Sequence, residues 1–205
     1  MARTKSSHQW MQEHFQDEYV KKAQALGYRS RAVFKLIEIQ EKDKIIRPGI
    51  NIVDLGAAPG GWSEYARKLL GKNDKIIALD LLDIEPIPGV EFIQGDFRED
   101  EVLEKLHKVL DGQPVHLLLS DMAPNISGNK EMDQPRSIYL GELALDAAHS
   151  ILVKGGTFLI KMFQGAGYDE YLNQVKQHFN SVVIRKPKAS RARSNEVYIL
   201  AKGFK

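Results

Sequence analysis

The chain has 205 residues, of which 43% are hydrophobic and 27% are charged, the composition of a globular protein with room for one well-cored domain. It contains no cysteine, which excludes a disulfide framework, a thiolate metal site and a thiol nucleophile. No apolar stretch approaches the roughly 18 residues of a membrane helix, and the amino terminus lacks the apolar centre of a secretory signal, so we expect a cytoplasmic protein.

The net charge of +2 conceals an asymmetry along the chain. Residues 1–35 hold seven Lys/Arg and three Asp/Glu, and residues 176–205 hold eight and one, so the middle of the chain is acidic. Basic ends around an acidic centre favour contact with a polyanion, most often nucleic acid. Basic termini that serve only solubility are the alternative.

Two segments precede the first expected strand. Residues 1–28 are mostly polar and carry a basic excess, and we expect them to form a helical arm outside the core. The stretch SRAVFKLIEIQEKDK, residues 30–44, predicts a helix with Ser30 as its cap and an apolar stripe facing the core. Lys35 falls within this apolar run.

From about residue 50, β-prone runs alternate with helical patterns, which predicts a single α/β domain over residues 29–205 with a mostly parallel sheet and helices on both faces. Strands are expected at 51–55, 75–80, 90–94, 115–120, 157–161, 181–184 and 196–202, and helices at 62–71, 98–110, 135–153 and 169–179. The last two strands are separated by RKPKASRARSN, which is polar, basic and too short for a helical crossover. The last strand should therefore run antiparallel to its neighbours.

A glycine-rich loop follows the first strand in NIVDLGAAPGGWSEY. Gly56, Gly60 and Gly61 allow a tight turn and a close approach of a ligand to the backbone, at the strand end where open α/β sheets bind ligands. The spacing is not G-x-G-x-x-G, and no Lys-Ser/Thr follows the glycines, so neither pyrophosphate nor triphosphate binding is well supported.

Two aspartates extend this candidate cofactor site. Asp80 ends the second strand, 20 residues after Gly60, where a carboxylate can accept hydrogen bonds from both ribose hydroxyls of an adenosine. Asp96 follows the third strand and can reach an adenine amino group, although either aspartate can instead cap a turn. Trp62, next to the loop, can pack beside the cofactor or serve as a core residue. The pattern indicates an adenosine cofactor without an essential phosphate, and S-adenosylmethionine fits.

Three motifs carry a resemblance to a known family. DLGAAPGGWSEY, SDMAPNISG and FLIKMFQG, in this order, resemble the FtsJ family of RNA ribose 2′-O-methyltransferases, and the resemblance runs from about Ser30 to Lys202. It implies a Rossmann-like methyltransferase fold with seven strands, the last one antiparallel. It also implies S-adenosylmethionine as cofactor, a catalytic set of Lys35, Asp121, Lys161 and Glu196, and a second role for Asp121 in cofactor binding. The amino-terminal segment is similar to that of the bacterial member that methylates a uridine in 23S ribosomal RNA.

The residue types of this set suit methyl transfer to a ribose hydroxyl. Asp121, Lys161 and Glu196 stand at strand ends that meet at one rim of the sheet. A ribose hydroxyl is a poor nucleophile, so a general base helps, and a lysine amine serves only when it is neutral. Burial and a second cation, Lys35, favour the neutral form of Lys161, whereas Asp121 would orient the amine and oppose that form. Taken singly, each residue can also be an ordinary surface, turn or ion-pair residue.

Basic residues outside this set are candidates for contacts with RNA phosphates. They are Arg29 and Arg31 near the first helix, and Arg185, Lys186, Lys188, Arg191 and Arg193 before the last strand. No His/Asp/Glu cluster has the spacing of metal ligands, so no metal is expected. We therefore expect a monomeric enzyme acting on ribosomal RNA of the large subunit. Transfer RNA or a messenger RNA cap is the alternative substrate. A non-catalytic ribosome-assembly factor and a dinucleotide-dependent oxidoreductase are alternatives of other classes.

Overall fold

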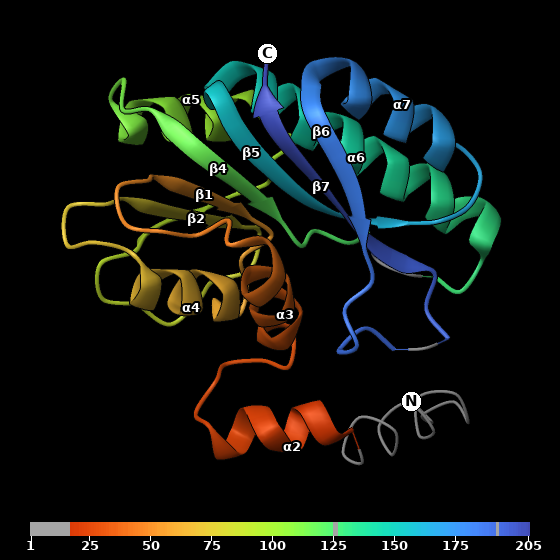
Figure 1. The fold of residues 1–205 in the computed structure, drawn as a ribbon, viewed down its shortest axis with the longest axis horizontal. Coiled ribbons are helices and arrows are strands. Elements are labelled where there is room, and N and C mark those ends of the chain that lie inside the picture. Colours follow the sequence, from red (N-terminus) through yellow and green to blue (C-terminus); the bar gives the residue numbers. More distant parts are fainter. Residues whose placement is uncertain (1–16, 125–126, 192) are drawn as a thin grey trace.

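The computed structural model describes residues 17–124, 127–191 and 193–205, and its centre is one seven-stranded sheet of order β3-β2-β1-β4-β5-β7-β6 (Figure 1). β7 pairs antiparallel with both β5 and β6, and the other pairs are parallel, as the sequence predicted. The strands are β1 (Ile52–Leu55), β2 (Ile76–Asp80), β3 (Glu91–Gln94), β4 (Val115–Ser120), β5 (Leu152–Phe163), β6 (Phe179–Arg185) and β7 (Glu196–Phe204).

Helices cover both faces of the sheet, which makes the domain a three-layer α/β fold (Figure 1). One core cluster joins the sheet to α5, α6 and α7, and a second joins the opposite face to α3 and α4. The helices are α2 (Glu18–Ala25), α3 (Val33–Asp43), α4 (Gly61–Leu69), α5 (Asp100–Leu110), α6 (Lys130–Ile151) and α7 (Tyr168–His178). Among the described residues, no helix combines the length and apolarity needed to cross a bilayer.

α3 and α6 begin where the sequence did not place them. The sequence pattern placed this helix at 135–153, but α6 begins five residues earlier, at Lys130, and contains Pro135. There the Asn129 side chain accepts a hydrogen bond from the Glu131 N–H. The Ser30 cap is also wrong, because α3 starts after Ala32 without a side-chain cap, and Ser30 contributes only its carbonyl oxygen, to the Val33 N–H.

β5 is seven residues longer than expected, because five residues that include the glycine pair precede Thr157 in the strand and two follow Lys161. The register of β4 and β5 shifts between the pairs Val115–Leu152 and Leu117–Thr157, so the intervening residues of β5 form a bulge. Gly155 adopts φ +82° there, a conformation that favours glycine.

The described part of the amino-terminal arm packs on α3 rather than on the sheet. Val20 and Ala23 of α2 are buried, and Ala23 belongs to a small cluster with Val33 and Phe34 of α3 and with Ala189. Residues 1–16 of the arm lie outside the described residues. The proposed boundary between the arm and the methyltransferase domain stays a prediction.

Candidate active site

Strand register brings the catalytic candidates to one rim. Leu55 of β1 pairs with Ser120 of β4, and Ser120 pairs with Ile160 of β5, so Gly56, Asp121 and Lys161 follow at the same edge. β7 enters from this edge, because its first residues pair with the last residues of β5. Glu196 and Tyr198 at the start of β7 therefore lie at the carboxyl ends of the parallel strands.

Lys161 and Asp121 form the first of two buried ion pairs. The Lys161 Nζ lies 3.0 Å from Oδ1 of Asp121 and donates a hydrogen bond to the Asp121 carbonyl oxygen at 2.5 Å. The Lys161 side chain is only 8% exposed and that of Asp121 16%. The lysine at the strand end is thus held in one place by two oxygens of a single residue.

Lys35 and Glu196 form the second pair, with Lys35 Nζ 2.7 Å from Oε1 of Glu196. The Ser190 hydroxyl donates to the same oxygen at 2.8 Å, and Lys186 Nζ donates to the Glu196 backbone carbonyl at 2.5 Å. α3 supplies Lys35 from outside the sheet, as the resemblance required. Its nearest acid is Glu196, so the structure divides the four residues into two neutralised pairs.

Tyr198 connects the two pairs, and sequence analysis missed it. Its hydroxyl donates to Oδ1 of Asp121 at 2.7 Å, and Lys35 Nζ lies 5.7 Å from its ring centroid. Trp62 packs against it with ring centroids 5.7 Å apart. Tyr198 lies directly across from Lys161 in the β5–β7 pairing, so only the register of two distant strands could have found it.

The charges of the rim fix the protonation of Asp121 and Tyr198. Burial alone would raise the pKa of Asp121, but the ammonium groups of Lys161 and Lys35 and the Tyr198 hydroxyl outweigh it and lower that pKa. Burial, followed by the charge of Asp121, raises the pKa of Tyr198 well above its usual value. Asp121 therefore accepts as a carboxylate, and Tyr198 donates as a neutral phenol.

The glycine loop packs against the loop that carries Asp121. Gly56 adopts φ +74°, and a Cβ there would lie 2.9 Å from both the backbone nitrogen and the Cα of Met122. A side chain at Gly56 would force these two loops apart and displace Asp121. Gly60, with φ +98°, precedes α4, and Gly61 is the first residue of that helix. Trp62 is buried and donates its indole N–H to the Ala32 carbonyl, so it also joins α4 to α3.

The two aspartates predicted to hold an adenosine already have protein partners. Asp80 accepts backbone N–H bonds from Ala58 and Leu82, one on each carboxylate oxygen, at 2.8 Å. A carboxylate oxygen accepts two bonds, so both oxygens keep capacity for ribose hydroxyls. Asp96 binds the Arg98 guanidinium, and the hydrogen bonds from Arg98 lower the pKa of Asp96 to about 2.

Asp54 adds an acid that the sequence reasoning did not select. It is buried in β1, accepts a bond from the Ser63 hydroxyl at 2.7 Å, and its Oδ1 has no hydrogen-bond partner among the described residues. Burial raises its pKa to about 7; the Ser63 bond opposes this rise, and the charges of Asp121 and Asp80 add to it. Three aspartates at the ends of neighbouring strands make this part of the rim suited to a cationic ligand, and S-adenosylmethionine carries a sulfonium and an ammonium group.

Several candidate RNA contacts already bind other parts of the chain. Arg29 donates to the carbonyls of Pro59, Glu85 and Pro86. Arg31 pairs with Asp17, and Arg185 makes a two-bond pair with the Asp43 carboxylate at 2.7 and 2.8 Å.

In the segment before β7, Lys186 Nζ donates to the Ser194 and Glu196 carbonyls, and Nε of Arg191 lies 3.9 Å from Oδ2 of Asp17. Arg193 is exposed. Lys188 is exposed and lines a cavity. These observations leave the RNA-binding role of the basic segment as a prediction.

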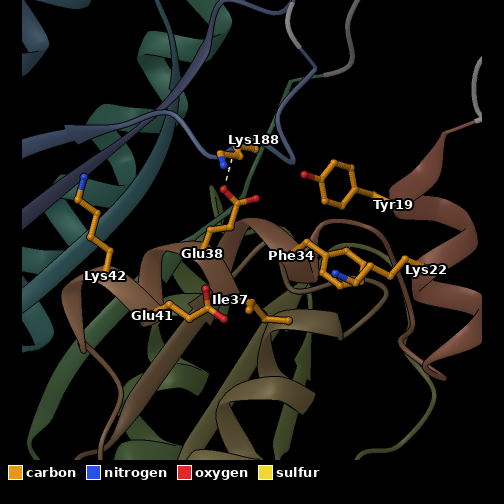
Figure 2. A pocket seen from close by; sticks show the side chains of 8 residues that line it. All are labelled: Tyr19, Lys22, Phe34, Ile37, Glu38, Glu41, Lys42 and Lys188. Atoms are coloured by element: carbon orange, nitrogen blue, oxygen red, sulfur yellow. Dashed lines mark hydrogen bonds between the residues drawn. The ribbon is translucent and has the colours of Figure 1, made fainter.

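That cavity, of about 540 Å³, lies between α3, α2 and Lys188 (Figure 2). α2 contributes Tyr19 and Lys22, and α3 contributes Phe34, Glu38 and three further residues. The Glu38 carboxylate accepts the backbone N–H groups of Lys188 and Ala189. Because none of the four catalytic candidates lines this cavity, it is separate from the rim.

Among the described residues, no three His, Cys, Asp or Glu side chains are grouped to hold a metal ion.

Residues 28–204 match the family model described as FtsJ-like methyltransferase. Among solved structures, the chain is similar to a Plasmodium falciparum protein provisionally assigned as a ribosomal RNA methyltransferase. The two are 33% identical with a TM-score of 0.76, and the match covers 86% of this chain and 98% of that one.

Proposed function

The chain belongs to the FtsJ-like methyltransferase family, and we propose that it methylates the ribose 2′-hydroxyl of a uridine in 23S ribosomal RNA of the large subunit. Family membership makes it an S-adenosylmethionine-dependent methyltransferase. The proposed substrate rests on the similarity of the amino-terminal segment to the bacterial member and on the basic ends of the chain. A cytoplasmic location and a monomeric state stay predictions.

S-adenosylmethionine supplies a methyl group that its sulfonium charge already activates for displacement. We assign its binding to the loops after β1, β2, β3 and β4. The residues that would hold it are Gly56, Gly60, Gly61, Trp62, Asp80, Asp96 and Asp121. The acidic surroundings of Asp54 support this assignment, because buried carboxyl groups without a nearby cation favour a positively charged ligand.

Lys161 is the proposed general base for the 2′-hydroxyl. A neutral amine has two N–H groups and one lone pair, and the structure offers Lys161 two acceptors, the Asp121 carbonyl and Oδ1. If both N–H groups bond to Asp121, the lone pair points away from that residue and is free to take a proton. This anchoring of Lys161 by two oxygens is the single observation that carries the proposal.

Lys35 and Glu196 complete the catalytic set from the other side of Tyr198. When Lys161 is neutral, the charge of Lys35 helps to keep Asp121 ionised. Glu196 neutralises Lys35 and fixes it through the bond to Oε1. We propose that this second pair positions Lys35 beside the attacking ribose.

Lys161→Ala tests the role of the base directly. Single-turnover methyl transfer to large ribosomal subunits should fall by about 10²–10⁴-fold, the usual loss for a general base, while affinities for S-adenosylmethionine and RNA stay near normal. Lys161→Arg should fail as well, because a guanidinium stays protonated. Lys176→Ala, on the exposed face of α7, is the control. Near-normal transfer by the arginine variant would show that position 161 supplies only positive charge.

Mapping of 2′-O-methyl groups in total RNA, with and without the protein, tests the substrate. The proposal expects one uridine of 23S RNA to lose its methyl group, and transfer in vitro to large subunits or 23S RNA but not to transfer RNA or capped messenger RNA. Methylation of either of the latter two would refute the ribosomal substrate. Defective subunits with every methyl group in place would instead indicate a non-catalytic assembly factor.

A further inference from the structure

A second cavity, of about 320 Å³, opens at the edge of the sheet opposite the rim. Four separate segments form it: the connection from α3 to β1, the start of β4, the bulge of β5 and the end of β7, which leads to the carboxyl terminus (Figure 1). Its lining residues are Lys44, Ile45, Arg47, Ile50, His116, Val153, Lys154, Gly155, Gly156, Thr157 and Lys202. None of these residues belongs to the site described above.

The lining is strongly basic, with four cations and no Asp or Glu. Lys44, Arg47 and Lys154 are exposed, and Lys202 is partly buried with its Nζ donating to the Asp43 carbonyl at 3.1 Å. The Asp43 carboxylate offsets the charge of Lys202 only in part, because Arg185 also holds this carboxylate with two hydrogen bonds. Like charges gathered in one concave place repel each other unless an anion joins them.

Neutral donors complete the cavity. Nδ1 of His116 accepts the Asn51 N–H at 3.1 Å, so the other ring nitrogen, Nε2, carries the N–H of the neutral ring. Gly155 is exposed, and a Cβ added to it would meet no atom within 4 Å, so the backbone of the bulge is open to a ligand. Flexible cations with open backbone and imidazole donors suit the several acceptor oxygens of a phosphate group.

We infer that this cavity binds a phosphate group of the RNA backbone, at a second contact on the far side of the domain from methyl transfer. The inference rests on the proposed function, because it identifies a part of the same RNA substrate. Val115 and Asp121 are six steps apart along the strand, each with a rise of about 3.3 Å, so the cavity and the rim lie roughly 20 Å apart. A short oligonucleotide at the rim does not reach this cavity, whereas a large folded RNA does.

The test variant combines Lys44→Asn, Arg47→Gln and Lys154→Gln. Asn suits position 44 because Lys44 has φ +50°, a conformation that Asn tolerates. The control combines Lys72→Gln, Lys105→Gln and Lys108→Gln, which removes the same charge from exposed positions that do not line the cavity. Filter binding to 23S RNA over a range of salt concentrations is the measurement, with inorganic phosphate as a competitor.

The test variant should bind 23S RNA about tenfold more weakly, and its salt dependence should lose a slope of about 0.7–0.9 for each lost phosphate contact. The control variant should match the wild type, and both should bind S-adenosylmethionine normally. Equal affinities and slopes for the two variants would overturn the inference. A second result would also overturn it. If inorganic phosphate binds the cavity but the substitutions do not change RNA binding, the cavity is a site for free phosphate.

Failure of the proposed function gives a different result. Wild-type protein that binds 23S RNA through these cations but does not methylate it would refute the proposed reaction and leave the second contact standing. A short RNA that contains only the methylated region adds an internal check. The test variant should bind this short RNA as well as the wild type does, and weaker binding to it would place the cations at the rim and overturn the inference.

Discussion

Tyr198→Phe isolates one hydrogen bond of the active rim. The substitution removes the hydroxyl that donates to Oδ1 of Asp121 at 2.7 Å and keeps the ring that packs against Trp62. A hydrogen bond to a charged group contributes about 1.5–3 kcal/mol to stability. Because the Asp121 side chain is 16% exposed, water can replace part of this bond. We therefore expect the free energy of unfolding to fall by about 1.5–2 kcal/mol.

Tyr171→Phe is the matched control, since it removes the same atom from another buried tyrosine. The Tyr171 hydroxyl donates to the Gly141 carbonyl at 2.9 Å, an uncharged acceptor. A hydrogen bond between neutral groups contributes about 0.5–1.5 kcal/mol. The control should cost less stability than Tyr198→Phe and should leave methyl transfer unchanged, because the Tyr171 hydroxyl bonds to α6 and not to Asp121 or Lys161.

Urea denaturation with an unchanged m-value measures both losses, and single-turnover transfer measures the effect on the reaction. Tyr198→Phe should also slow transfer, because Asp121 holds Lys161 and loses one of its partners. A stability loss for Tyr198→Phe no larger than that of the control would refute the reasoning, since it would show that the bond carries no contribution from the charge of Asp121.

Three further predictions concern the cofactor site and the basic segment. Asp80→Ala should weaken S-adenosylmethionine binding by roughly 2–4 kcal/mol, because two bonds to a charged group are lost; unchanged affinity in calorimetry would remove Asp80 from the site. Burial raises the pKa of Asp54 to about 7, and its ionised form favours a cationic ligand, so S-adenosylmethionine affinity should rise with pH through that value in the wild type but not in Asp54→Asn. Parallel pH profiles would contradict this role. Neutralising Arg185, Lys186, Lys188, Arg191 and Arg193 together should flatten the salt dependence of RNA binding. Arg185→Gln alone should chiefly lower the free energy of unfolding, by about 1–2 kcal/mol, through loss of the partly exposed Asp43 pair. Denaturation measures the stability of the Arg185→Gln variant. An unchanged salt slope of RNA binding would mean that the basic segment serves only solubility.

The sheet was predictable from the sequence because its strands are short, apolar and separated by helical patterns. The antiparallel last strand followed from one local fact, the short polar connection RKPKASRARSN. The errors arose where local rules compete. The helix expected at 135–153 begins earlier, after the capping Asn129, and the strand expected at 157–161 extends back through the two glycines as a bulge.

The site was predictable only in part, for the same reason. Strand ends of a parallel sheet meet at one rim, and this rule places Asp121, Lys161 and Glu196 together without any knowledge of side-chain contacts. Lys35 came from the family resemblance alone, since its position depends on how α3 packs. Which lysine pairs with which acid, and the bond from Tyr198, depend on the register of β5 and β7, which no local pattern contains.

Stability alone does not explain two ion pairs in this place. Removing two charges from water costs several kcal/mol for each ion, and well-packed apolar side chains of similar volume often stabilise a protein as well or better. At this rim the pairs are nevertheless joined through Tyr198 and set beside Asp54 and Asp80, where a cationic ligand is favoured. The pairing cancels the charges of Lys35 and Lys161 locally, so the two lysines can lie next to an acidic cofactor site without filling it themselves. We propose that this arrangement leaves the Lys161 amine for the reaction and Asp54 and Asp80 for the cofactor, so that the pairs serve the reaction rather than the fold.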